Sequence, residues 1–239
     1  MQPSNFKVLK VINVSKSFPG VKALDNISLD IQGGKVHALM GENGAGKSTL
    51  IKILAGVYSK NSGDLFFDEE KIQISNPLDS LNLGIQVVYQ EIALIPEFTV
   101  GENIFSEKFP TNKFGFIDWK KLYNDSNILF KKIGFNLNAK TKTANLSISE
   151  QQMVEIAKAV SKNASLVVMD EPTSSLTPNE IDKLFNVIDN LKKQNIAILY
   201  VTHKIDEIFR IADEVTVLRD GKFISHSNIT ETNEEKIIK

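Results

Sequence analysis

Eight residues at 41–48 match a phosphate-binding pattern in which glycines precede a lysine and a serine at fixed spacing. Glycine lets the backbone turn its N–H groups toward a phosphate, the lysine contacts the β- and γ-phosphates, and the hydroxyl coordinates Mg²⁺. The segment follows an apolar run and precedes a helical pattern, as this motif requires. We therefore predict an ATP site that comprises Gly41, Glu42, Asn43, Gly44, Ala45, Gly46, Lys47, Ser48 and Thr49.

Two adjacent carboxylates, Asp170 and Glu171, follow a second apolar run. A buried strand has little reason to end in two acids unless a cation or a water molecule needs them. Asp170 is placed to hold Mg²⁺ through water, and Glu171 is placed to polarise an attacking water. Without the phosphate-binding loop, the same pair could be two solvated loop residues.

Two more polar side chains, Gln90 and His203, follow apolar runs. A lone histidine is more often a packing or capping residue, but open α/β sheets bind ligands at the ends of their strands, which favours a catalytic His203. Gln90 could reach both Mg²⁺ and the attacking water. The predicted catalytic residues are Lys47, Gln90, Glu171 and His203, and the predicted metal ligands are Ser48, Gln90 and Asp170.

The elements that position these side chains follow an α/β pattern. Apolar runs at 35–40, 84–89, 166–169 and 196–201 predict buried strands, and helical patterns follow or lie between them at 48–56, 147–160, 178–193 and 204–212. Alternating residues predict shorter strands at 8–14, 27–31, 64–67, 215–218 and 223–225, with a hairpin turn at 220–221. We predict an α/β fold with a mostly parallel sheet, an N-terminal antiparallel β subdomain and a helical subdomain inserted at about 91–160, including a helix from 118 to 132.

Composition narrows the classes of function. The 239 residues are 42% hydrophobic and 24% charged, with a net charge of −1, which is typical of a globular domain and gives no global attraction to nucleic acid. The absence of cysteine excludes disulfides and thiolate metal sites. No apolar run approaches the roughly 18 residues that cross a bilayer, so a connection to a membrane would run through another protein.

Taken together and in this order, the motifs resemble the ATP-binding cassette family over essentially the whole chain. The resemblance rests on the phosphate-binding loop, Gln90, the Leu-Ser-Ile-Ser-Glu segment at 146–150, the two carboxylates and His203. Segments at 16–24, 151–158, 174–177 and 211–221 are similar to bacterial importers of ribose, galactose and xylose, whose ATPase carries two cassettes in one polypeptide. The resemblance implies a P-loop NTPase core in a single nucleotide-binding domain over 1–239. A capping box at Thr232 and Glu235 begins a helix that the chain soon ends, so we expect a longer protein, and the resemblance implies that a second cassette follows.

The resemblance also implies a function and partners. It implies an ATPase that uses ATP and Mg²⁺ to power import of a monosaccharide, bound peripherally at the cytoplasmic face of the cell membrane. Its partners would be a second cassette (in the same polypeptide or as a dimer mate), membrane-spanning permease subunits and, indirectly, a sugar-binding protein, with no nucleic acid. Phe18 would stack on adenine or, alternatively, belong to the core of the β-layer. The apolar residues 92–96 would line the groove for the permease or be part of the core of the helical subdomain.

The chain departs from the family's LSGGQ signature, which approaches the γ-phosphate bound by the opposite cassette. The positions that would act in trans are Ser147, Ile148, Ser149 and Glu150. Two of them replace glycines with side chains, and the last adds negative charge beside a polyanion. The same residues form a capping box that starts a helix. We expect this signature to complete a weak or non-hydrolysing site, and the phosphate-binding loop of this chain to lie in the productive one.

Three other functions can be weighed. A soluble cassette ATPase that acts on ribosomes or DNA would need long coiled-coil insertions or basic linkers, which the sequence lacks. A GTP switch would need a guanine-reading Asn-Lys-x-Asp segment, which is also absent. A nucleotide clamp that binds ATP with little turnover stays open.

Overall fold

The computed structural model describes residues 7–238, which divide into two compact units. Unit 1 comprises the described residues up to Val87, Ser165–Glu171 and the chain from Lys192 onward. Unit 2 comprises Val88–Ala164 and Pro172–Leu191. Within residues 7–238, no helix is both long and apolar enough to span a bilayer.

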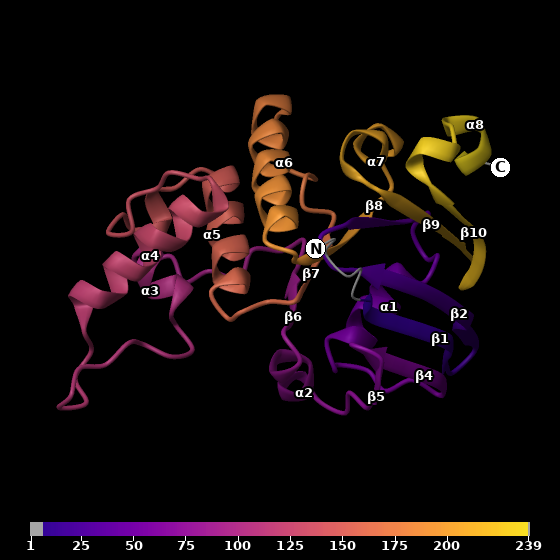
Figure 1. Ribbon diagram of the computed structural model, residues 1–239, viewed down its shortest axis with the longest axis horizontal. Coiled ribbons are helices and arrows are strands. Elements are labelled where there is room, and N and C mark those ends of the chain that lie inside the picture. Colours follow the sequence, from indigo (N-terminus) through magenta and orange to yellow (C-terminus); the bar gives the residue numbers. More distant parts are fainter. Residues whose placement is uncertain (1–6, 239) are drawn as a thin grey trace, which may run out of the picture. The chain divides into compact units, whose positions relative to one another are not determined.

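Unit 1 is built on a ten-stranded sheet with the order β5-β4-β1-β2-β10-β9-β3-β8-β7-β6 (Figure 1). The central strands β9, β3, β8 and β7 pair in parallel, whereas β1 pairs with β2 and β4 in antiparallel fashion. The predicted α/β fold class is confirmed. The strands are β1 (Lys7–Phe18), β2 (Val21–Gln32), β3 (Val36–Met40), β4 (Ser62–Phe67), β5 (Glu70–Ile72), β6 (Ile85–Val88), β7 (Leu166–Asp170), β8 (Ala197–Thr202), β9 (Glu214–Arg219) and β10 (Lys222–Asn228).

Alternation along the central strands separates two apolar clusters. Leu39 of β3 belongs to the larger cluster, with the apolar side of α1 (Lys47–Leu54), whereas its neighbour Ala38 belongs to the smaller one. The smaller cluster includes residues of α7 (Ile205–Ile211) and α8 (Glu234–Ile238). Helix α1 therefore packs on one face of β3, and α7 packs on the other.

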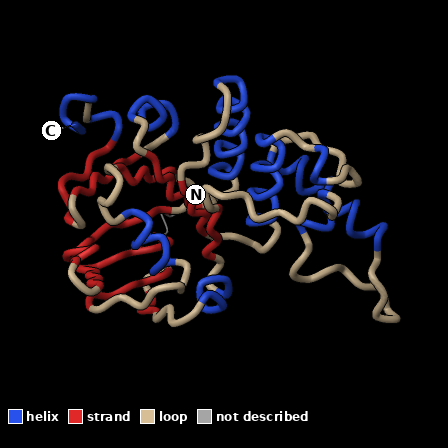
Figure 2. The backbone as a smooth tube through the Cα atoms, turned by 180° about the vertical axis from the view of Figure 1, so that it is seen from behind, coloured by secondary structure: helices blue, strands red, loops and turns tan. Residues whose placement is uncertain are grey.

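Unit 2 is helical, with α3 (Val100–Ile104), α4 (Trp119–Ile133), α5 (Ile148–Val160) and most of α6 (Pro178–Lys193). Figure 2 shows these segments as helices joined by loops. The Asn103 side chain, 1% exposed, bonds both the N–H and the carbonyl of Ile95 and the hydroxyl of Thr143. This one amide therefore holds two loops of unit 2 against α3.

Several elements differ from the sequence-based expectation. β1 and β2 are each 12 residues long and form one hairpin, where we expected two shorter strands. The helices α2 (Pro77–Asn82) and α3 were not predicted, because five or six residues are too few to show a helical period. The capping box expected at Thr232 and Glu235 was wrong, because α8 begins at Glu234 and the Asn233 side chain accepts the hydrogen bond from the Lys236 N–H.

An ion pair joins the starts of two strands that lead to the predicted phosphate site. The Lys35 Nζ lies 2.6 Å from Glu214 Oε1, and the His37 Nδ1 lies 3.7 Å from Glu214 Oε2. The His37 imidazole, and then the Lys35 ammonium, hold the pKa of the Glu214 carboxyl at about 2. The Lys35–Glu214 pair therefore ties the start of β3 to the start of β9 while Glu214 is ionised.

Replacing this carboxylate should give a pH-dependent loss of stability. Glu214→Gln should lower the free energy of unfolding at pH 7 by about 2 kcal/mol, because Lys35 loses a charged partner. Since folding depresses the pKa of Glu214, its contribution is present above about pH 4.5 and is lost as the pH falls toward about 2. Urea unfolding from pH 7 to pH 3 should therefore show the two proteins converging. Glu235→Gln, at an exposed position, is the control, and a gap that stays constant with pH would contradict the assignment.

Candidate functional site

The predicted phosphate-binding loop connects β3 to α1 in unit 1. A Cβ at Gly41 would lie 2.5 Å from the Leu218 carbonyl oxygen, and a Cβ at Gly46 would lie 2.6 Å from the Ala23 carbonyl oxygen. Gly46 also has a φ of 101°, which favours glycine. The loop can therefore take this path only with glycine at these two positions.

The turn between β9 and β10 supports the loop from outside. Its Gly221 N–H donates to the Ala45 carbonyl at 3.2 Å, and its Gly221 carbonyl accepts from the Asp25 N–H at 2.7 Å. Sequence reasoning predicted this hairpin turn but not its contact with the loop. The turn signal at 220–221 carried no information about a partner more than 170 residues earlier in the chain.

Lys47 extends back across the loop. The whole residue is 6% exposed. Its ammonium donates to the Gly41 carbonyl at 2.6 Å and to the Glu42 carbonyl at 3.0 Å. Burial lowers the pKa of Lys47, and the nearby Glu171 and Asp170 oppose that shift. The side chain is thus a buried cation held by the loop that precedes it. The first turn of α1 also carries Ser48, which is exposed, and Thr49, which is partly buried.

The two predicted carboxylates lie at the end of β7. Burial, and then the charge of Glu171, raise the pKa of Asp170, while Lys47 opposes the shift. Glu171 has a φ of 47°, in the left-handed region that few non-glycine residues adopt. Its N–H donates to the Val201 carbonyl of β8 at 2.9 Å, so the unusual backbone is fixed by the sheet.

His203 follows β8 and meets Glu171 directly. The His203 Nδ1 lies 3.0 Å from Glu171 Oε1. The histidine side chain is 54% exposed and the glutamate side chain 17% exposed, so the pair is open to solvent on the histidine side. Unit 1 therefore brings Lys47, Asp170, Glu171 and His203 together, as a site of one cation, two carboxylates and an imidazole.

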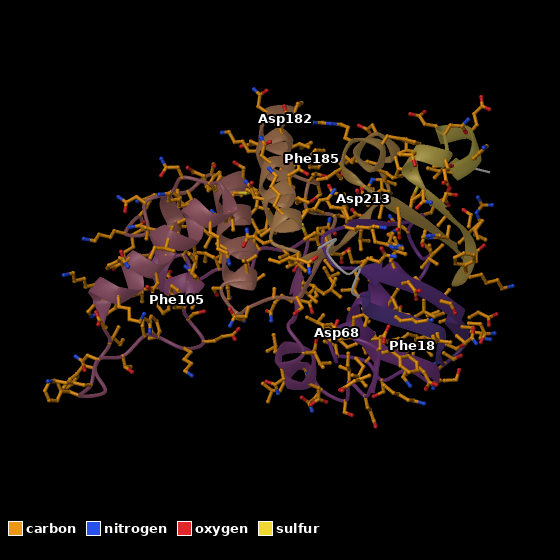
Figure 3. All side chains as sticks on the ribbon, in the orientation of Figure 1. Phe18, Asp68, Phe105, Asp182, Phe185 and Asp213 are labelled. Atoms are coloured by element: carbon orange, nitrogen blue, oxygen red, sulfur yellow. The ribbon has the colours of Figure 1, made fainter. Side chains whose placement is uncertain are left out.

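Phe18 is partly buried at the end of β1 (Figure 3). Its ring meets the Tyr58 ring edge to face at 5.2 Å between centroids, and the Lys16 Nζ lies 5.1 Å from the Phe18 centroid. Sequence reasoning did not find Tyr58 or Lys16 as neighbours of Phe18. The Phe18 ring is held in place without being fully buried, which is compatible both with stacking on adenine and with a place in the core of the β-layer.

The remaining predicted residues belong to unit 2. Gln90 is exposed, two residues after the end of β6. The signature positions open α5, where Ser147 is the N-cap. The Glu150 carboxylate folds back to accept from the Ser147 N–H at 2.9 Å and from the Ser147 hydroxyl at 3.0 Å. The structure thus gathers four of the predicted residues in one unit, and places Gln90 and the signature in the other.

The residues of unit 1 fit a magnesium nucleotide. The loop between β3 and α1 packs against the Leu218 and Ala23 carbonyls at Gly41 and Gly46, whereas nothing lies within 4 Å of a Cβ added at the exposed Gly44, where the backbone is open to a phosphate. Ser48 and Asp170 offer the hydroxyl and carboxylate oxygens that Mg²⁺ prefers. A cation beside Asp170 would also offset the burial that raises the pKa of this carboxyl.

Comparison with known proteins identifies the family of the chain. Residues 24–174 match the profile of the ABC transporter family, which covers well over half of the chain. The chain belongs to the ABC transporter family. This ABC cassette contains the phosphate loop and both carboxylates within the matched segment, and His203 lies beyond it.

Relatives and solved structures resemble the cassette over nearly all of its length. It is 49% identical over 97% of its residues to the galactose/methyl galactoside import ATP-binding protein of Clostridium perfringens, of which it covers 45%. It is also 49% identical over 97% of its residues to the xylose import ATP-binding protein of Thermoanaerobacter pseudethanolicus, of which it covers 46%. The cassette therefore spans slightly less than half the length of the curated relatives it matches.

Among solved structures, an ATP-binding cassette of an ABC transporter in its ADP conformation superposes with a TM-score of 0.85 and 25% identity, and the match covers 97% of both chains. A dimeric bacterial ABC transporter cassette superposes with a TM-score of 0.76 and 24% identity, covering 92% of this chain and 98% of that one. These matches confirm the fold, and the family confirms that this is an ATP-binding cassette.

The contacts of Gly41 give a direct test of the loop. Gly41→Ala should abolish ATP binding by the cassette, because its Cβ would meet a backbone oxygen that cannot move without shifting β9. Gly115→Ala is the control for backbone strain without a clash, because alanine is disfavoured at its φ of +84° but nothing lies within 4 Å of the added Cβ; it should lose some stability and keep its affinity for ATP. Titration with a fluorescent ATP analogue, beside thermal unfolding, measures both effects. Unchanged affinity in Gly41→Ala would show that the loop does not hold the phosphates.

Proposed function

We propose that this cassette binds ATP with Mg²⁺, hydrolyses it, and so powers import of a monosaccharide through membrane-spanning permease subunits. The observation that carries the proposal is the convergence of Lys47, Asp170, Glu171 and His203 in one compact unit. The sugar assignment rests on the names of the galactose and xylose import relatives, each 49% identical to this chain.

The phosphate loop and its flanking side chains would hold the triphosphate. Backbone N–H groups of the loop and the N-terminus of α1 face the phosphates, and the Lys47 ammonium turns from the loop carbonyls to the β- and γ-phosphates. Ser48 and Asp170 would hold Mg²⁺. When bound, Mg²⁺ neutralises charge that develops on the phosphate oxygens.

Glu171 and His203 would direct the water. The Glu171 carboxylate accepts a hydrogen bond from the attacking water, which becomes a better nucleophile for the γ-phosphorus. The imidazole 3.0 Å away holds this carboxylate in place and can contact the γ-phosphate from its exposed side. The P–O bond to ADP breaks as the bond to water forms, and Lys47 compensates the charge on the phosphoryl oxygens.

Phe18 would stack on the adenine ring. Its ring is already fixed edge to face by Tyr58, so one face can serve as a platform for the base without reordering. Lys16, beside the same ring, adds a positive charge that favours a nucleotide over a neutral aromatic ligand.

The segment after Gln90 would meet the permease. The segment at 92–96 includes Ile95, which is 41% exposed. Asn103 holds this segment against α3, and the Glu155 carboxylate of α5 accepts a hydrogen bond from the Ala93 N–H. An exposed apolar segment with a rigid backbone is a suitable surface for a helix of another subunit. The cassette would thus sit at the cytoplasmic face of the membrane through its permease, while a sugar-binding protein selects the sugar.

A second cassette, in the same polypeptide or as a dimer mate, would complete each ATP site. The signature of this chain is a poor complement, because the Glu150 carboxylate already occupies the N-terminus of α5 through two bonds to Ser147. An anionic side chain at that position repels the γ-phosphate of the other cassette. The productive site would therefore combine the phosphate loop of this chain with the signature of the second cassette.

ATP binding can be tested on the 239-residue chain. Lys47→Ala should abolish binding of Mg-ATP, because the loop loses the cation that contacts the β- and γ-phosphates. Lys131→Ala, at an exposed position of α4, should bind like the unaltered chain. Isothermal titration with ATP measures both, and equal affinity of all three proteins would overturn the site.

Turnover tests the asymmetry. The chain alone should hydrolyse ATP slowly. The family's signature is restored by the triple variant Ile148→Gly, Ser149→Gly, Glu150→Gln. This variant should hydrolyse ATP roughly tenfold faster or more, because two copies can complete each other's sites. Adding Glu171→Gln should remove that gain while ATP still binds. Fast hydrolysis by the unaltered chain, lost on Glu171→Gln, would refute the asymmetry and keep the ATPase. No hydrolysis in any variant, with binding intact, would identify a nucleotide clamp.

A further inference from the structure

Glu207 is a buried carboxylate that the hydrolytic site described above does not use. It lies in the first turn of α7, is 2% exposed, and belongs to unit 1. Helix α7 packs against β8, the strand that ends just before His203. A carboxylate removed from water in this way is retained only with charged or hydrogen-bonding partners. The partners of Glu207 therefore indicate its role.

Two partners of Glu207 lie at the end of β8, and another follows this strand in the chain. The Tyr200 hydroxyl donates to Glu207 Oε2 at 2.8 Å, and the Thr202 hydroxyl donates to the same oxygen at 3.3 Å. The Lys204 Nζ lies 3.1 Å from Glu207 Oε1. Tyr200 and Thr202 are two residues apart on one strand, so both hydroxyls face the same side of the sheet as α7.

Two of these partners flank His203. Thr202 precedes it and Lys204 follows it, and the Lys204 N–H donates to the Thr202 hydroxyl at 3.0 Å. The three-residue turn at 202–204 is thus closed by one hydroxyl that is itself bound to Glu207. The His203 side chain is 54% exposed, so the backbone of this turn, rather than packing around the ring, sets where the imidazole lies.

An ordinary capping role does not describe this geometry. Glu207 occupies the third helical position of α7, from which a glutamate usually reaches back to the N–H of the capping residue. Here the capping residue is Lys204, and the Thr202 hydroxyl accepts from its N–H. The Glu207 carboxylate instead binds the hydroxyls at the end of β8 and the Lys204 ammonium.

We infer that Glu207 is a positioning residue that holds His203 against Glu171, acting through Thr202 and Lys204. The inference rests on the proposed hydrolysis, because the His203–Glu171 contact is the one that orients the attacking water. Glu207 touches neither nucleotide nor water in this scheme. Displacing the imidazole by about an ångström would cost turnover without costing ATP binding.

The first test is made without nucleotide, so that it does not depend on the proposed function. Nitrogen-15 NMR of the His203 ring in the 239-residue chain reports the hydrogen bond at Nδ1. In Glu207→Gln the Nδ1 resonance should move in the same direction as in Glu171→Gln, because both changes part the pair. Asp206→Asn, at the exposed neighbouring position of α7, should match the unaltered chain. A resonance that moves in Glu171→Gln but not in Glu207→Gln would overturn the inference.

The second test measures ATP hydrolysis in the background that carries the restored signature. Glu207→Gln should lower kcat roughly ten- to hundredfold with the KM for ATP within about twofold, and should add almost nothing to His203→Ala. A full additional loss in the double variant would overturn positioning through His203. Absence of hydrolysis in every protein would refute the proposed function instead, and the NMR comparison would still decide the inference.

A second pair of variants guards against loss of folding in Glu207→Gln. Thr202→Val removes the connecting hydroxyl and keeps the shape of the side chain, whereas Thr202→Ser keeps the hydroxyl. The valine variant should reproduce the NMR shift and the loss of kcat, and the serine variant should restore both most of the way. Equal behaviour of valine and serine would show that this hydroxyl does not carry the effect, and would also overturn the inference.

Discussion

In-register pairing of the parallel strands is the constraint on which the site depends. β8 pairs with β3 so that Met40 lies opposite Thr202, and β8 pairs with β7 equally in register. The loops that follow these strands therefore begin at one edge of the sheet, where Glu171 and His203 meet. A slip of one residue would turn alternate side chains to the other face and part this pair. Apolar clusters on both faces hold the register, and so the chemistry depends on residues that never touch nucleotide.

The same edge of the sheet holds charged groups that are partly removed from water, which raises the free energy of their charged forms. Burial disfavours the charged forms of both Lys47 and Asp170, as the directions of their pKa shifts show, and each opposes the shift of the other. Glu171 adds a left-handed backbone that a glutamate rarely adopts. Buried charges and strained backbone destabilise the folded state, so contacts elsewhere in the fold must compensate. The ion pair of Lys35 with Glu214, at the start of β3, and the hydrogen bond from the Gly221 N–H to the Ala45 carbonyl, in the loop after β3, are two such contacts.

The sequence located the residues that meet at the edge of the sheet better than it located the contacts that support them. Motif spacing located the loop, the carboxylates and His203, because local order along the chain is enough to place residues at strand ends. It could not show that Gly221 bonds the loop, or that Glu207 reaches Thr202, because such contacts join distant segments and involve ordinary residue types. The long β1–β2 hairpin was underestimated for a related reason. Register shifts near Val14 and Lys16 interrupt the alternation by which strands are recognised.

Capping and catalysis place opposite demands on the start of α5. A glutamate that closes a capping box stabilises the helix because it satisfies N–H groups that would otherwise lack partners. The same N–H groups and the same helix dipole are what a signature offers to the γ-phosphate of another cassette. In this chain the Glu150 carboxylate lies at the start of α5, where it accepts hydrogen bonds from Ser147. The contact stabilises the helix and lowers the affinity of its N-terminus for an anion. Under the proposed function, a chain that carries both such a signature and the hydrolytic residues would suit an unequal pair, in which the other cassette would supply the open helix terminus.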